Sequence, residues 1–151
     1  MNNKPLKQWW QLLPALLFLY IFLPSVTQAQ IRFATFNVSL NRTAEGELVD
    51  HLVAGNHEQI SSIAAIIQHV RPDVILLNEF DFAGERAIAA VEHFQKNYLS
   101  KPVDGLKPIE YGYAYTGPVN TGIPSGLDLD GNGKSNDPTD CFGFGRYPGQ
   151  Y

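Results

Sequence analysis

The sequence is poor in cysteine and in basic residues. Cys141 is the single cysteine among 151 residues, so no intrachain disulfide can stabilise the fold. Lysine and arginine together number 11 against 15 acidic residues, and the formal net charge is −4. A basic stripe is the usual electrostatic footprint of nucleic-acid binding. Its absence argues against a dedicated nucleic-acid-binding protein, although a metal ion can supply positive charge that this count misses.

Long apolar runs are confined to one segment near the N-terminus. Two lysines precede the run Leu12–Leu23, and small residues ending at Ala29 follow it, which is the order typical of a secretory signal peptide. The run contains Pro14 and is shorter than the about 20 apolar residues of a bilayer span, so an uncleaved anchor is the weaker alternative. We therefore expect residues 1–29 to be removed, leaving an exported protein, periplasmic or secreted, with no stable membrane span.

The first part of the exported chain has the pattern of a strand, a helix and a second strand. Residues 31–38 are almost all apolar or β-forming, as are residues 73–79, which is typical of strands covered on both faces. Between them, Asn56 can cap a helix that Arg71-Pro72 ends. Its apolar side chains recur at helical spacing: Ile60, Ile63, Ala64, Ile67 and Val70. Such units are parallel and right-handed, so both strands should end at the same edge of the sheet.

Regular structure should become sparser after the second strand. A second amphipathic helix is expected from about Glu85 to Leu99, a third strand at residues 111–116, and a short helical piece around residues 48–52. Residues 117–140 hold much of the chain's glycine, proline, aspartate and asparagine. This composition predicts a long structured loop.

Asn37 and Glu79 come at the predicted carboxyl ends of the two strands, where ligands of open α/β sheets gather. A hard cation such as Mg²⁺ takes oxygen ligands, so a carboxylate with an amide beside it suits part of its coordination shell. Such an ion would polarise a phosphoryl oxygen and offset charge on a leaving group. From spacing alone, a second interpretation stays open, in which Asn37 starts a turn and Glu79 is a solvated acid.

The segment Ala34-Thr35-Phe36-Asn37, followed by an amphipathic helix and by Arg71-Pro72-Asp73-Val74-Ile75-Leu76-Leu77-Asn78-Glu79-Phe80, resembles the opening of the endonuclease/exonuclease/phosphatase superfamily. The resemblance implies a deoxyribonuclease-I-like α/β fold, a two-layer mixed β-sandwich flanked by helices. It also implies that Glu79 is the ligand of a catalytic Mg²⁺ or Mn²⁺. Asn37 would belong to the same metal and phosphate site and would hydrogen-bond its members.

Two further motifs of that family do not occur in these 151 residues. They are Gly-Asp-x-Asn, whose aspartate orients the nucleophile, and the closing Ser-Asp-His. The resemblance therefore covers an incomplete, N-terminal portion, and we expect this portion alone to be inactive. The four histidines give no substitute: His51 is expected in the loop, His57 and His69 on or beside the first helix, and His93 on the second, all as solvated residues.

The expected activity is hydrolysis of a phosphodiester or phosphomonoester: a small phosphoester, a lipid headgroup or extracellular nucleic acid. No protein partner is evident.

A separate signal lies in the acidic loop. Asp128-Leu129-Asp130-Gly131-Asn132-Gly133 matches the first half of a calcium loop, with oxygen ligands at alternate positions. The second half departs from that pattern, since Thr139 stands where a bidentate glutamate belongs, with Asp137 and Asp140 close by. The predicted ligands of a Ca²⁺ ion are Asp128, Asp130, Asn132, the backbone carbonyl of Lys134, and Asn136.

Two alternatives accompany this loop. It could be a solvated turn with no ligand. It could also be the functional part of a non-catalytic exported calcium-binding or interaction module, in which Asn37 and Glu79 are structural.

Overall fold

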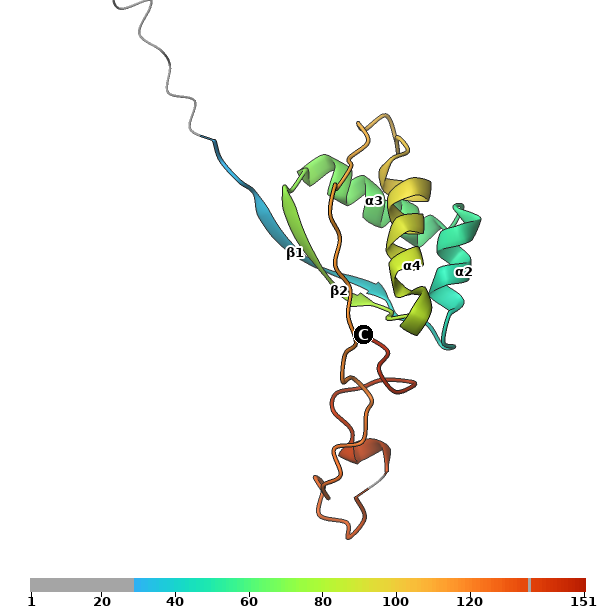
Figure 1. The fold of residues 1–151 in the computed structure, drawn as a ribbon, viewed down its shortest axis with the longest axis vertical. Coiled ribbons are helices and arrows are strands. Elements are labelled where there is room, and N and C mark those ends of the chain that lie inside the picture. The colour runs from blue at the N-terminus through green and yellow to red at the C-terminus, as the bar shows by residue number, and fades with distance from the viewer. Residues whose placement is uncertain (1–28, 136) are drawn as a thin grey trace, which may run out of the picture. The chain divides into compact units, whose positions relative to one another are not determined.

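The computed structural model describes residues 29–135 and 137–151. The predicted signal peptide lies outside these residues, apart from Ala29. In the part of the chain that is described, no helix has the length and apolar character needed to cross a bilayer. Residues 31–151 form one unit of mixed α/β structure with a two-stranded parallel sheet and three α-helices (Figure 1).

The two strands are β1, Phe33–Leu40, and β2, Val74–Phe80. They pair in parallel, with Phe33 opposite Val74 and Asn37 opposite Asn78, so the predicted strand, helix, strand unit is confirmed. The expectation that both strand faces are covered is wrong for the described chain. Exposed and covered side chains alternate along each strand, and on the open face the exposed fractions of Phe33 and Leu76 are 72% and 61%. The sheet is therefore packed on one side only.

Three helices cover the other face: α2, Glu47–Ala54; α3, Glu58–Val70; and α4, Ala87–Phe94. A 3₁₀ turn, Gly84–Arg86, leads into α4, and a π-helical segment, Gln95–Leu99, continues it, which confirms the helix expected from Glu85 to Leu99. Helical spacing of apolar residues places one stripe of each helix in a shared core. The main core members are Val38, Leu40, Leu48, Leu52, Ile60, Ile63, Ile67, Phe94 and Tyr98.

The start of α3 differs from the prediction. Asn56 does not cap this helix; His57 occupies the N-cap position, without a side-chain cap hydrogen bond. The Tyr98 hydroxyl joins the two helix ends instead, because it accepts from the His57 N–H at 3.1 Å and donates to the His51 carbonyl, which belongs to α2, at 2.8 Å. At the other end of α3, Arg71 adopts a left-handed conformation and its N–H donates to the Ile67 carbonyl. Pro72 follows, so the helix ends where the sequence predicted.

The prediction of a third strand at residues 111–116 is wrong. No strand occurs there, and the Tyr111 N–H bonds the side-chain oxygen of Gln95 at 3.2 Å rather than a neighbouring strand. Tyr113 and Tyr115 are almost fully exposed. The following loop is nevertheless ordered at its base, where Pro124 and Cys141 form an isolated antiparallel bridge. A 3₁₀ turn, Pro138–Asp140, closes the loop.

Candidate functional site

An irregularity in the sheet shapes the edge where the two strands end. The regular register holds up to Asn37 and Asn78, then shifts before Leu40 pairs with Phe80. Within this irregularity Ser39 and Glu79 both have positive φ, 49° and 56°, a conformation that non-glycine residues rarely adopt. Register irregularities of this kind commonly re-aim a side chain beside an active site. Here the residue affected is Glu79.

Both carboxylate oxygens of Glu79 accept amide hydrogen bonds. Asn37 donates its side-chain Nδ2 to Oε1 at 2.7 Å, and Asn41 donates its Nδ2 to Oε2 at 2.8 Å. The Asn37 oxygen is engaged elsewhere, since it accepts from the Ser39 N–H at 3.0 Å. Asn37 thus presents its donor side to the carboxylate, and Glu79 is the group with free lone pairs.

The structure brings together the two residues that the sequence selected at the strand ends. Asn37 and Glu79 lie side by side, as parallel strands predict, although β1 continues three residues beyond Asn37. Asn37 is exposed on the open face of the sheet, where Thr35 and Asn78 also share a hydrogen bond of 3.0 Å. Sequence reasoning missed Asn41; its only signal was a position shortly after Asn37 in the predicted loop.

Two histidines beside this edge differ from the prediction of solvated residues. His51 belongs to α2 rather than to a loop, and its ring lies 4.5 Å from the ring of His57. Arg42 donates to His51 Nδ1 at 3.2 Å and to Gln59 at 3.1 Å, so a cation lies against this pair. Burial, and then the neighbouring His51 and Arg42, lower the pKa of His57, which keeps this ring neutral near pH 7.

Asp81 is a further acidic residue near this edge, and the sequence pattern did not single it out. It is buried, and its Oδ2 accepts from the Arg42 N–H at 2.8 Å while Oδ1 has no hydrogen-bond partner. Burial raises the pKa of Asp81, against the opposing effect of the Arg42 hydrogen bond. The Gln150 side chain donates to the Arg42 carbonyl at 2.8 Å, so the last described residues also pack against this region.

The acidic loop stands on a hydrogen-bonded stem. The Ser125 N–H bonds the Asp140 carbonyl and the Phe142 N–H bonds the Ile123 carbonyl, both at 2.8 Å. Inside the loop, Asp128 accepts three backbone N–H groups, from Gly131, Asn132 and Gly133, at 2.7 to 3.0 Å. These bonds fold the Asp-x-Asp-Gly-Asn-Gly segment into a tight turn.

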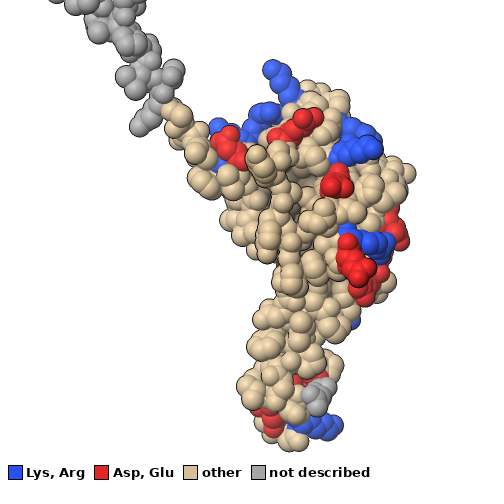
Figure 2. All heavy atoms as spheres, in the orientation of Figure 1, with Lys and Arg blue, Asp and Glu red and all other residues tan. Residues whose placement is uncertain are grey.

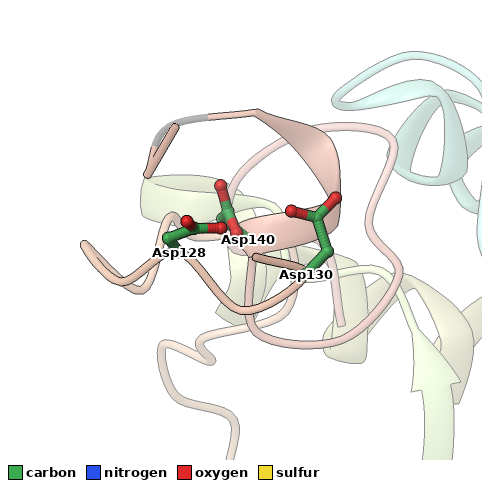
Figure 3. A group of neighbouring side chains, drawn as sticks. All are labelled: Asp128, Asp130 and Asp140. Atoms are coloured by element: carbon green, nitrogen blue, oxygen red, sulfur yellow. The ribbon is translucent and has the colours of Figure 1, made fainter. Parts of the chain in front are cut away.

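Three aspartates of this loop lie together: Asp128, Asp130 and Asp140. Each offers one carboxylate oxygen, and these oxygens come within 4.8 Å of one another, so the group could hold a metal ion. Figure 3 shows the carboxylates of Asp128 and Asp130 turned toward Asp140. Asp137 lies beside this group, and hydrogen bonds from the Thr139 hydroxyl, the Asn132 amide and the Thr139 N–H lower the pKa of its carboxyl.

The structure brings some of the residues predicted as loop ligands into this group and leaves others out. Asp128 and Asp130 belong to the observed group, whereas Asn132 turns its amide nitrogen to Asp130 and Asp137 and its oxygen to the Lys134 N–H. Asn136 lies outside the described residues. Asp140 takes part in their place, because the 3₁₀ turn Pro138–Asp140 brings it back to the start of the loop. The sequence placed it close by without assigning it a role.

Comparisons with profiles of known protein families, with curated proteins and with solved structures found no match. The resemblance to the endonuclease/exonuclease/phosphatase superfamily therefore rests on the residues around Asn37 and Glu79 themselves.

One face of the described residues can be judged for its surface charge. On the face drawn in Figure 2, lysine and arginine are interspersed with aspartate and glutamate. This face carries no continuous basic stripe.

Proposed function

We propose that this protein is an exported metal-dependent phosphoester hydrolase whose Mg²⁺ or Mn²⁺ is held by Glu79. The observation that carries the proposal is the Glu79 carboxylate, fixed by the amides of Asn37 and Asn41 at the edge where two parallel strands end. A residue kept in a costly backbone conformation at such an edge is a frequent mark of a functional site.

The residues present fit a hard divalent cation. Glu79 offers two carboxylate oxygens, each of which retains a lone pair after accepting one amide hydrogen bond. Among the described residues the one ion pair joins Arg86 to Asp50, so no lysine or arginine neutralises Glu79 there. Mg²⁺ is commonly bound by one or two carboxylates with several waters retained. When bound, such an ion polarises a phosphoryl oxygen and offsets the charge of the leaving group.

The chain's own residues would have distinct roles. Glu79 would hold the ion, while Asn37 and Asn41 would fix the orientation of its carboxylate. Asn37 is exposed and in direct contact with Glu79, so its amide is also placed to meet a phosphate oxygen at the edge where the two strands end. The substrate would be a small phosphoester, a lipid headgroup or scavenged extracellular nucleic acid, since the exported chain is acidic.

The complete fold would be a deoxyribonuclease-I-like sandwich, in which residues 31–151 supply one sheet and its helices. The apolar open face of the β1–β2 sheet supports this, because in a sandwich that face packs against a second sheet. The groups that orient the attacking water would come from the second part of such a domain. Residues 30–151 alone would then have little activity.

The deciding experiment compares Glu79→Gln with the wild type in the full-length protein, which here means a chain that extends to the natural end of the proposed domain. The substitution keeps the shape and removes the charge, so hydrolysis of a generic phosphodiester and a generic phosphomonoester should fall by orders of magnitude and partly recover at high Mg²⁺ or Mn²⁺. Asn37→Ala should lower turnover with less dependence on metal concentration.

Glu85→Gln is the matched control, because Glu85 is an exposed acid shortly after the same strand. It should leave turnover unchanged. Wild-type turnover of Glu79→Gln at limiting metal would remove Glu79 from the metal site. A full-length protein without any phosphoesterase activity would favour the non-catalytic calcium-binding or interaction module instead.

A further inference from the structure

Asp140 is unusual among the acidic residues of the long loop because it is fully buried. Its exposed fraction is 0%, whereas Asp128 and Asp130 are exposed. One oxygen, Oδ1, accepts from the Leu129 N–H at 2.7 Å, and the other, Oδ2, is buried without any hydrogen-bond partner. A buried carboxylate oxygen without a partner is costly, so such an atom calls for a ligand.

The partner that Asp140 lacks is not supplied by a basic side chain. The loop from Asp128 to Asp140 contains four aspartates and one basic residue, Lys134, and no ion pair forms within its described residues. Instead the carboxylates of Asp128 and Asp130 face Asp140, with their oxygens within 4.8 Å (Figure 3). Like charges at this separation repel one another, and a cation between them would remove the repulsion.

The chemistry of the loop favours calcium among the common cations. All three ligands are carboxylate oxygens, which suit hard cations. Calcium also accepts irregular shells with loop carbonyls and water, which a loop of this kind can supply.

We propose that Asp128, Asp130 and Asp140 bind one Ca²⁺ ion, which fixes the acidic loop on its stem. The proposal rests on two observations. Asp140 is buried with one oxygen that lacks a partner, and the carboxylates of Asp128 and Asp130 lie close to it. The site is separate from Glu79 and does not depend on the proposed hydrolase activity.

The test is calorimetric titration of Ca²⁺, with Mg²⁺ as a second arm, into the chelator-treated full-length protein carrying Glu79→Gln. This background weakens binding at the other candidate site. One Ca²⁺ should bind per chain, more tightly than Mg²⁺. Asp130→Asn and Asp140→Asn should each lower the Ca²⁺ affinity at least tenfold. Asp104→Asn removes an exposed carboxylate outside the loop and should have no effect.

A second measurement covers the case in which Asp140→Asn fails to fold. Lys134 is exposed within the loop, so a calcium-independent lysine-specific protease can cleave after it. Ca²⁺ should slow this cleavage in the Glu79→Gln background. Asp130→Asn changes an exposed side chain and should abolish this protection by Ca²⁺. Absence of saturable Ca²⁺ binding, tighter binding of Mg²⁺ than of Ca²⁺, wild-type affinity in Asp130→Asn, or cleavage that Ca²⁺ does not slow would each overturn the proposal.

Discussion

The backbone of Glu79 is under strain. Its φ is 56°, and the left-handed conformation costs a non-glycine residue about 1–2 kcal/mol. Glycine would avoid that cost but would supply no carboxylate to Asn37 and Asn41. The chain therefore gives up stability at the position where the proposed chemistry needs a side chain, a pattern common at functional sites.

This strain can be measured with two substitutions that both delete the carboxylate. Glu79→Gly and Glu79→Ala lose the same hydrogen bonds, but only glycine adopts positive φ without steric cost. Chemical denaturation should find the glycine variant more stable than the alanine variant by about 1 kcal/mol. The same pair at Glu85, where the side chain lies in a 3₁₀ turn, should not favour glycine. Equal stability of the two Glu79 variants would show that the backbone relaxes when the carboxylate is removed.

At this scale the sequence predicted contacts that follow from strand direction. Asn37 and Glu79 come together because parallel strands end at one edge, and that inference needs only hydrophobic pattern. Asn41 and Asp140 could not be assigned in the same way. Asn41 reaches Glu79 only because the register shifts after Asn37, and Asp140 depends on a turn that returns the chain to Asp128.

The helices meet at a buried polar side chain. Gln68 of α3 has an exposed fraction of 2%, and its Nε2 donates to the carbonyls of Leu99 and Lys101 at 3.0 and 2.6 Å. Its oxygen accepts from the Val103 N–H at 3.2 Å. These are backbone groups at the end of the π-helical segment, where carbonyls have no partner within the helix. The Gln68 side chain of α3 therefore supplies hydrogen-bond partners to backbone groups at and just beyond the end of the segment Gln95–Leu99.

Gln68→Met tests this joint between the helices. Methionine has nearly the same length but cannot donate or accept these hydrogen bonds, so the Lys101 carbonyl and the Val103 N–H would lose this partner, whereas the Leu99 carbonyl keeps the Ile109 N–H. Each such loss costs about 1–3 kcal/mol, and we expect the free energy of unfolding to fall by about 2–4 kcal/mol. His69→Gln, at the adjoining exposed position, should change it by less than about 0.5 kcal/mol. A loss that small for Gln68→Met would mean that water replaces the missing contacts.

The sequence predicted helices and strands correctly where apolar residues recur at one clear spacing. It failed where contacts with other parts of the chain determine the backbone conformation. The stripe from Ile60 to Ile67 predicted α3, and the Pro72 signal predicted its end. Residues 111–116 have strand-like composition, but Tyr111 pairs with Gln95, and Tyr113 and Tyr115 point into solvent. β-propensity alone does not form a strand unless a neighbour offers a ladder.

At the scale of the described unit, the sheet is covered on one face only. The open face carries Phe33, Val74 and Leu76, with exposed fractions of 72%, 48% and 61%. Helices α2, α3 and α4 pack on the opposite face (Figure 1). Contiguous exposed apolar residues on a sheet mark a surface that associates with other structure.

We therefore expect residues 30–151, produced alone, to self-associate or to fold only in part. Sedimentation velocity should show a weight-average mass that rises with concentration. Phe33→Thr with Leu76→Thr should shift the protein toward monomer, because threonine keeps strand propensity while removing apolar surface. Ile88→Thr is the matched control, since Ile88 is 54% exposed on α4, away from the sheet, and it should leave association unchanged. A monomeric wild-type chain with cooperative thermal unfolding would show that the open face needs no cover, and the argument for a second sheet packed against it would fail.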